Sequence, residues 1–232
     1  MEILKEFEKL ANPEKAQQLQ RFFKTGKGQY GEGDIFLGIV VPEQRKLANK
    51  FDLKLDEIQK LLSSKIHEHR LTSLFILIKK YKKAIKEKNE KLKKEIYDFY
   101  IKNAKNINNW DLVDLSAPNI MGNFLLDKDK SILYRLAKSG NLWERRIAVL
   151  STFHFIKVNR FDDALKIAEL LLNDEHDLIH KAVGWMLREI GKRDKGVLIN
   201  FLEEHYKEMP RTMLRYSLEK LSKKEKQKYM AK

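Results

Sequence analysis

The sequence predicts an all-α protein, an α-solenoid (αα superhelix) of HEAT-like or armadillo-type helical repeats. Helix breakers are rare, with four prolines and ten glycines among 232 residues. Apolar residues recur at helical spacing, as at Ile58, Leu61 and Leu62, while alternation with a period of two is scarce. Segments with a common frame also return every few tens of residues, which is typical of α-solenoids.

Composition and length favour one repeat domain that spans residues 1–232. With 43% hydrophobic and 34% charged residues, the chain is apolar enough to bury a core. The absence of cysteine excludes disulfides, thiolate zinc sites and a cysteine nucleophile. The longest charge-free stretch, residues 115–126, is shorter than the roughly 20 residues of a membrane helix. The amino terminus has no signal-peptide pattern, so we expect a cytoplasmic protein without membrane contact. We expect a monomer because a repeat array could cap its own ends, and the oligomeric state stays open.

Three of the four prolines stand where a helix would begin. Pro13 follows Asn12, which is suited to capping a helix, and Pro42 and Pro210 precede further helical patterns. Pro118 is different because it lies inside an apolar pattern, where it predicts a kink or a short break.

Five seven-residue segments can be aligned with one another: residues 68–74, 109–115, 144–150, 179–185 and 209–215. Their third positions are residues 70, 111, 146, 181 and 211. Most follow an apolar stretch with helical periodicity, namely residues 51–62, 91–103, 128–137 and 161–172. The third position is basic in four units (Arg70, Arg146, Lys181 and Arg211) and acidic in one (Asp111). Because helical-repeat arrays line a concave surface with one helix of each pair, the pattern predicts a cationic stripe interrupted by acid.

The formal charge of +14 is concentrated in two segments. Residues 79–105 hold eleven lysines and four acids (11 − 4 = +7), and residues 209–232 hold eight basic residues and two acids (8 − 2 = +6). A surface that binds polyanions and ordinary solvated helix faces both explain such segments, and the two interpretations stay open here.

Two other motifs are weaker than they look. Residues 26–31 (GKGQYG) match the dinucleotide pattern G-x-G-x-x-G, but the segment before them looks helical and the one after them looks like loop. We therefore expect a mobile basic-aromatic loop. His176 and His180 share a helix face without a third ligand at a suitable spacing, so no metal site is expected.

The residues that suggest chemistry surround a tryptophan. Trp110, Trp143 and Trp185 all lie in or beside the repeated segments, where core packing is the ordinary role of a tryptophan. Trp110 and Asp114 are four residues apart and would share a helix face. Asp111 is close enough to the expected helix start to interact with the helix dipole, whereas Asp114 lies a turn further in.

Five segments, in order along the chain, resemble the DNA alkylation repair enzyme family of HEAT-like-repeat glycosylases. They are residues 12–16, 36–39, 110–114, 143–146 and 181–189, and the resemblance extends from about residue 12 to 192. It implies excision of N3- or N7-alkylated purines from duplex DNA by hydrolysis of the N-glycosidic bond, without a cofactor or metal. By this resemblance Asp114 is the catalytic carboxylate, Trp110 and Trp185 are aromatic walls, and Arg146 lies near the DNA backbone.

Further DNA contacts are expected from Arg45, Arg70, Lys181, Arg188, Arg211 and Tyr30. Val40 and Val41 depart from the polar side chains that relatives place after the glycine, so the contact to the undamaged strand is open. Two other functions remain open: a non-catalytic DNA-binding relative for bent or branched DNA, and a protein-binding HEAT scaffold. The preferred lesion, the acceptance of bulky adducts and the role of residues 26–34 are not fixed by the sequence.

Overall fold

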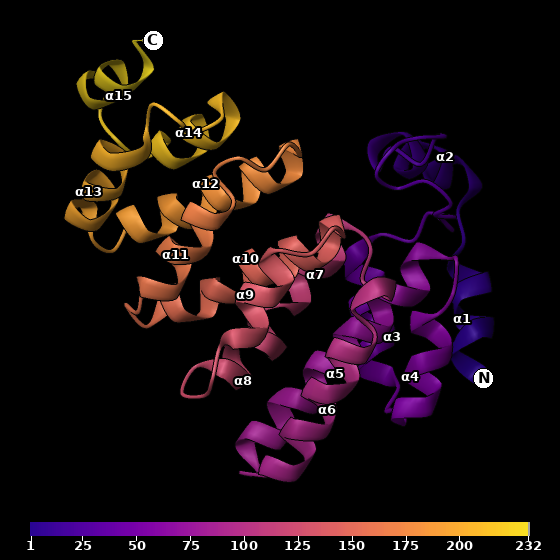
Figure 1. Cartoon of the computed structure of the whole chain (residues 1–232). Coiled ribbons are helices and arrows are strands. Elements are labelled where there is room, and N and C mark those ends of the chain that lie inside the picture. The colour runs from indigo at the N-terminus through magenta and orange to yellow at the C-terminus, as the bar shows by residue number, and fades with distance from the viewer. Residues whose placement is uncertain (232) are drawn as a thin grey trace. The chain divides into compact units, whose positions relative to one another are not determined.

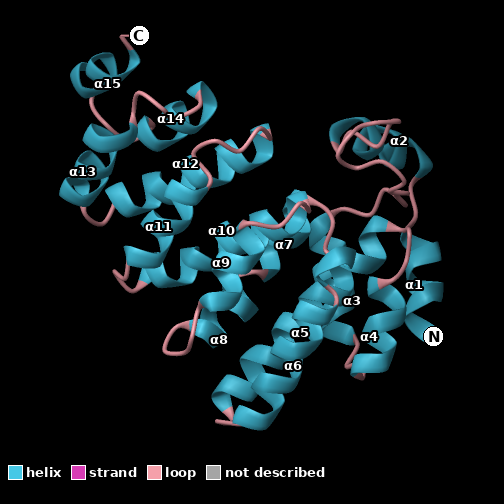
Figure 2. Ribbon diagram, viewed as in Figure 1, coloured by secondary structure: helices cyan, strands magenta, loops and turns pink. Residues whose placement is uncertain are grey.

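The computed structural model describes residues 1–231, and its helices form two compact units, Met1–Ser116 (unit 1) and a second that begins at Ala117 (unit 2; Figure 1). Helices and loops make up the described chain, without a strand, and one isolated bridge joins Ile35 to Ile66 (Figure 2). The all-α prediction is confirmed. The single-domain expectation for residues 1–232 stays a prediction. None of the helices in this part of the chain combines the length and apolar character needed to cross a membrane.

Unit 1 is made of seven α-helices and a 3₁₀ turn. In chain order they are α1 (Glu2–Leu10), α2 (Pro13–Phe22), α3 (Val41–Lys50), α4 (Leu55–Leu62), α5 (His67–Lys86), α6 (Glu90–Lys102), η1 (Ala104–Asn106) and α7 (Trp110–Ser116).

Unit 2 begins with a π-helical turn and continues with α-helices. They are η2 (Pro118–Gly122), α8 (Asn123–Leu125), α9 (Ser131–Ala137), α10 (Leu142–Lys157), α11 (Asp162–Leu170), α12 (Asp177–Gly191), α13 (Lys195–His205), α14 (Arg211–Leu218) and α15 (Lys223–Met230).

The helix boundaries follow the signals in the sequence. The Asn12 side chain accepts a hydrogen bond from the Lys15 amide at 2.9 Å and caps α2, which begins at Pro13. Proline also occupies the first turn of α3 and the N-cap of α14. At Pro118, α7 has ended and the backbone forms the π-helical turn η2, so the predicted break is confirmed.

The helices are arranged as repeats, in the order that the recurring segments predicted. The second helices of the five pairs are α5, α7, α10, α12 and α14, and each contains or begins at one of the predicted third positions. Within unit 1, α5 packs against α7; within unit 2, α10 packs against α12 and α12 against α14. Gly184 permits the last contact, because a Cβ there would lie 2.5 Å from the Met213 carbonyl oxygen of α14.

Candidate functional site

The first candidate surface is the short helix α7, which carries Trp110 and Asp114. Both are partly buried, and their spacing places them on one side of the helix. The Trp110 indole stacks on Phe23, with ring centroids 5.2 Å apart and planes inclined by 13°. Phe22, which is 63% exposed, meets the indole edge-on at 6.0 Å. One face of Trp110 is therefore covered by its own unit, and an exposed aromatic ring lies beside it.

The other end of α7 is fixed by a buried tyrosine of α6. The Tyr100 hydroxyl lies 2.8 Å from the Ser116 hydroxyl, which itself donates to the Leu112 carbonyl. Burial raises the pKa of Tyr100, and the negative charge of Asp114 acts in the same direction. Tyr100 consequently stays protonated and holds the last turn of α7.

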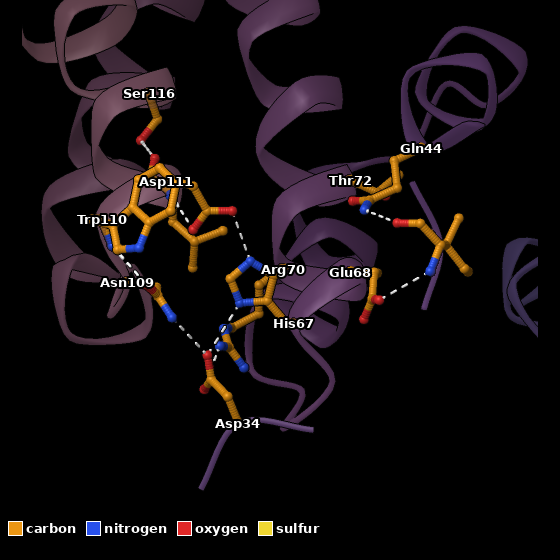
Figure 3. A network of polar contacts seen from close by, with 12 residues as sticks. Asp34, Gln44, His67, Glu68, Arg70, Thr72, Asn109, Trp110, Asp111 and Ser116 are labelled. Atoms are coloured by element: carbon orange, nitrogen blue, oxygen red, sulfur yellow. Dashed lines mark hydrogen bonds and ion pairs between the residues drawn. The ribbon is translucent and has the colours of Figure 1, made fainter. Parts of the chain in front are cut away.

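The start of α7 is joined to α5 and to the loop before Ile35 by a buried polar network (Figure 3). Its centre is His67, whose Nδ1 lies 3.1 Å from Asp34 and whose Nε2 lies 2.8 Å from Asp111. Arg70 donates to the other oxygen of Asp34 at 2.6 Å, and Asn109 donates to Asp34 at 3.2 Å. These five residues, which we call the α7 anchor, come from three separate segments of unit 1.

The geometry of the anchor defines the charge of His67. A neutral imidazole has one N–H and one lone pair, so it can donate to only one of the two carboxylates that flank it. Both ring nitrogens of His67 face a carboxylate oxygen, which requires the doubly protonated, positive ring. Although burial opposes this charge, Asp111 and Asp34 raise the pKa of His67 to about 9. With Arg70, the anchor holds two positive and two negative charges.

Glu68, the residue after His67, organises the segment that precedes α3. Its carboxylate is fully buried and accepts hydrogen bonds from the amides of Leu37, Gly38 and Ile39 at 2.8 to 3.2 Å. Gly38 has φ of 83°, and a Cβ there would lie 2.1 Å from the Asn12 carbonyl oxygen, so only glycine fits. The conformation of residues 36–39 is therefore fixed by the Glu68 carboxylate and by the glycine at position 38.

In unit 2 the predicted site residues lie on α10 and α12. Trp143 is 7% exposed and belongs to the core, whereas Trp185 is partly buried and donates to Glu189 at 3.3 Å. Arg146 is 5% exposed, and its guanidinium donates to the Leu178 carbonyl at 2.5 Å near the start of α12. This contact gives Arg146 a structural role in unit 2, and its expected place near the DNA backbone stays a prediction.

The other cations expected at DNA differ in their surroundings. Arg45 and Arg211 are exposed: Arg45 lies over the Phe75 ring at 4.2 Å, and Arg211 donates to the Met230 carbonyl. The Lys181 side chain is 40% exposed and pairs with Asp177 at 2.7 Å. Arg188 is more enclosed, with a side chain 17% exposed and paired with Glu219. Tyr30, in the glycine-containing loop, lies 6.0 Å from the Lys24 ammonium.

Arg70 corrects the predicted cationic stripe. It occupies the same repeat position as Lys181 and Arg211, yet it is 3% exposed and its guanidinium binds Asp34 and the Ser64 carbonyl. A phosphate cannot reach a side chain buried in this way. Asp111, the acidic member of the series, is likewise engaged by His67. At Arg70 and Asp111 the third position of the repeat therefore faces the α7 anchor. The positive charge of Arg70 is neutralised by a carboxylate of unit 1.

The two weak motifs have ordinary structural roles. Helix α2 ends before residues 26–31, and no helix follows them until Val41, which agrees with a loop and not with a dinucleotide fold. His176 caps α12 by accepting from the Leu178 amide, and His180 contacts the Asp174 carbonyl.

Helical pairs in series, with a tryptophan and a carboxylate on one side of α7, define the protein as a helical-repeat protein with a candidate catalytic surface. Residues 3–221 match the sequence model described as DNA alkylation repair enzyme, and the chain belongs to this family. The family acts on DNA. No curated protein sequence matches the chain.

Solved structures agree with the fold. A protein described as a predicted DNA alkylation repair enzyme from Enterococcus faecalis superposes with a TM-score of 0.71 at 19% identity, over 92% of this chain and 97% of that one. AlkD2 from Streptococcus mutans gives 0.53 at 18% identity, over 90% and 89%. The smu.31 protein from Streptococcus mutans UA159 gives 0.50 at 20% identity, over 93% and 94%. At these identities the likeness shows the helical-repeat fold.

Sequence reasoning missed most of the α7 anchor. Asp34, His67 and Asn109 were not recognised, and Asp111 was assigned to the helix dipole. The partners lie 33 to 75 residues apart, so no local pattern connects them. The signal that was available is the run from His67 to Arg70, which places two histidines, a glutamate and an arginine directly before the apolar stretch of the same helix.

Proposed function

We propose that the protein is a DNA glycosylase that releases cationic N3- or N7-alkylated purines from duplex DNA in base-excision repair. The observation that supports this most is the placement of Trp110 and Asp114 on one side of α7, in a chain of the DNA alkylation repair enzyme family. The acid lies a full turn into the helix, beyond the capping positions, beside an aromatic surface formed by Trp110 and Phe22.

The reaction requires little from the protein besides a fixed negative charge. A purine alkylated at N3 or N7 is already cationic, so the N-glycosidic bond can break with its electron pair moving to the base, which leaves neutral. The sugar then carries an oxocarbenium-like positive charge that a fixed carboxylate stabilises. In this proposal Asp114 supplies that charge and orients a water whose oxygen bonds to C1′, and the proton that this water loses passes to the solvent.

Aromatic and basic residues complete the proposal. The exposed part of the Trp110 indole suits contact with a cationic base or with an electron-poor sugar. Trp185 offers a second indole on α12, oriented by Glu189. Since Arg146 and Arg70 are buried, we assign phosphate contacts to the more exposed Arg45, Lys181 and Arg211 (together with Tyr30 in its loop).

The experiment is release of free base from duplex DNA that contains 7-methylguanine. The wild type should release it, Asp114→Asn should not, and Asp98→Asn should match the wild type, because Asp98 is an exposed acid paired with Lys94 on α6. No release by the wild type would contradict the proposal. In that case a steep salt dependence of DNA binding would indicate a non-catalytic DNA-binding protein, and weak, salt-insensitive binding a protein scaffold.

The tryptophans give a second comparison. Trp110→Ala and Trp185→Ala should each lower release more than Trp143→Ala, because Trp143 belongs to the core of unit 2 and the other two are partly exposed. Rates are compared per folded protein, as measured by circular dichroism. Equal effects of the three substitutions would mean that Trp110 and Trp185 are packing residues.

A further inference from the structure

Two side chains of the α7 anchor accept hydrogen bonds from backbone amides of α7, so the anchor also holds the start of this helix. The first amides of a helix have no partner within the helix and need one outside it. In α7 the Trp110 amide donates to the Asn109 side chain at 2.8 Å, and the Leu112 amide donates to the Asp111 side chain at 2.9 Å. Asn109 is held by Asp34, and Asp111 is held by His67.

The link between Asp111 of α7 and α5 runs through one buried residue, His67. His67 is 1% exposed and is the only group in the α7 anchor that contacts both carboxylates. The remaining cation, Arg70, donates to Asp34 and to the Ser64 carbonyl, and neither of these partners belongs to α7. Loss of His67 would remove the cation that holds Asp111, and the chain from Arg70 through Asp34 to Asn109 would remain as the polar link of the anchor between α5 and the start of α7.

Charge balance gives His67 a second effect on the same helix. With His67 positive, the charges of His67 and Arg70 offset those of Asp34 and Asp111 in a site where unbalanced charge is costly. Asp111 stands three residues before Asp114, close to it on the helix surface. The positive ring offsets the Asp111 charge, so that Asp114 acts beside a neutral pair instead of beside a second anion.

We propose that His67 is a positioning residue of the glycosylase: its positive ring, held between Asp34 and Asp111, fixes the first turn of α7 and balances the charge next to Asp114. The proposal rests on the proposed function for its kinetic consequences. His67 itself does not touch the DNA or the reacting atoms, since it is buried. It acts through the geometry of Trp110 and Asp114.

The test is a charge-matched pair of variants. His67→Gln removes the positive charge and leaves the α7 anchor with one negative charge in excess. His67→Gln combined with Asp111→Asn restores neutrality and allows an amide–amide hydrogen bond at the same place. The single variant should lower the single-turnover rate of 7-methylguanine release by about tenfold or more, as expected for a small misplacement of a catalytic group. Its affinity for the DNA should stay within about threefold, and the double variant should recover most of the rate.

A role in packing alone predicts the opposite order. If His67 merely contributes contacts, the second substitution removes more of them and the double variant is no faster than the single one. That result, or a wild-type rate for His67→Gln, would overturn the proposal. His205→Gln is the matched control, because His205 pairs with acids of unit 2 outside the site and its substitution should change release by less than about twofold.

A readout without activity separates this proposal from the proposed function. The three tryptophans give three indole N–H signals in an NMR spectrum, and the Trp110 signal is sensitive to the Phe22 and Phe23 rings beside it. His67→Gln should shift that signal alone, and the double variant should restore it. If the wild type releases no base, the proposed function fails, and this signal still tests the positioning; an unmoved Trp110 signal overturns it.

If His67→Gln does not fold, Asp111→Ala provides the same test. This substitution leaves His67 bonded to Asp34 and removes the link from His67 to α7, together with the acceptor of the Leu112 amide. It should shift the Trp110 signal and lower release at unchanged DNA affinity. An unchanged signal and rate would contradict the proposal.

Discussion

Glu68 offers a sharp test of how the segment before α3 is held. The Glu68 carboxylate is fully buried, and one of its oxygens accepts hydrogen bonds from Leu37, Gly38 and Ile39, while the other accepts from Leu37 as well. Glu68→Gln keeps the shape of the side chain. It replaces one oxygen by an NH₂ group that faces the Leu37 amide, and it removes the negative charge from the remaining contacts.

The expected loss follows from these contacts. A hydrogen bond to a charged group contributes about 1.5–3 kcal/mol and a neutral one about 0.5–1.5 kcal/mol. The bonds from Gly38 and Ile39 to the retained oxygen therefore weaken by about 1 kcal/mol each, and the Leu37 amide loses one of its two acceptors. Relief of the cost of burying a carboxylate offsets part of this, leaving a net destabilisation of about 2 kcal/mol. Glu68→Ala leaves three amides without their acceptor and should cost about 4 kcal/mol.

The assay is thermal unfolding followed by circular dichroism, together with amide hydrogen exchange at residues 37–39. Glu68→Gln should lower Tm by about 4–8 °C for a chain of this length, and exchange at the three amides should accelerate. Glu87→Gln is the control, because Glu87 is exposed at the other end of α5 and lies 3.8 Å from Lys83. If Glu68→Gln unfolds at the temperature of the wild type, the carboxylate does not hold this segment in the way described.

Three further predictions follow from burial, packing and charge. Arg70→Ala should cost about 3–5 kcal/mol of stability because it leaves Asp34 buried without its cation, whereas Arg211→Ala should leave Tm unchanged and reduce the salt slope of DNA binding by about 1; a reversed pattern would contradict the burial of Arg70. In a urea titration, Gly184→Ala should lower the free energy of unfolding by about 1–3 kcal/mol, because its Cβ would lie 2.5 Å from the Met213 carbonyl oxygen. Gly140→Ala is the control and should be nearly neutral, because the space around Gly140 is open. The raised pKa of His67, about 9, stabilises the folded state fully below pH 6.5, and this contribution is lost as the pH rises through 9. Between pH 6 and 10, the stability of the wild type should therefore fall by about 3 kcal/mol more than that of His67→Gln, and parallel profiles would show that His67 is not charged.

The order of helices could be predicted because its signals are local. Asn12 and Pro13 mark a helix start within four residues, and Pro118 marks a break by removing one amide hydrogen. Apolar spacing identified the helix pairs, since packing one face of each helix needs a period that the sequence itself displays. The candidate pair Trp110 and Asp114 was found in the same way, by its spacing on one helix.

The burial of charged residues could not be predicted from the same patterns. Arg70 and Arg211 occupy equivalent repeat positions, but only Arg70 meets a carboxylate, Asp34, which arrives from a loop 36 residues away. A basic residue at this position is exposed at the surface or buried in an ion pair, depending on whether a distant segment brings a carboxylate to it. For that reason the predicted cationic stripe was wrong at Arg70, and the α7 anchor was not foreseen.

The most direct test of the account separates binding from chemistry at Asp114. Single-turnover release of 7-methylguanine is measured with protein in excess over duplex DNA, beside the dissociation constant for the same DNA, for the wild type and Asp114→Asn. If Asp114 stabilises the transition state alone, its rate should fall by about 100-fold or more while the dissociation constant stays within about threefold. A rate that survives the substitution, or falls only in proportion to weakened binding, would contradict the assignment of Asp114 as the catalytic carboxylate.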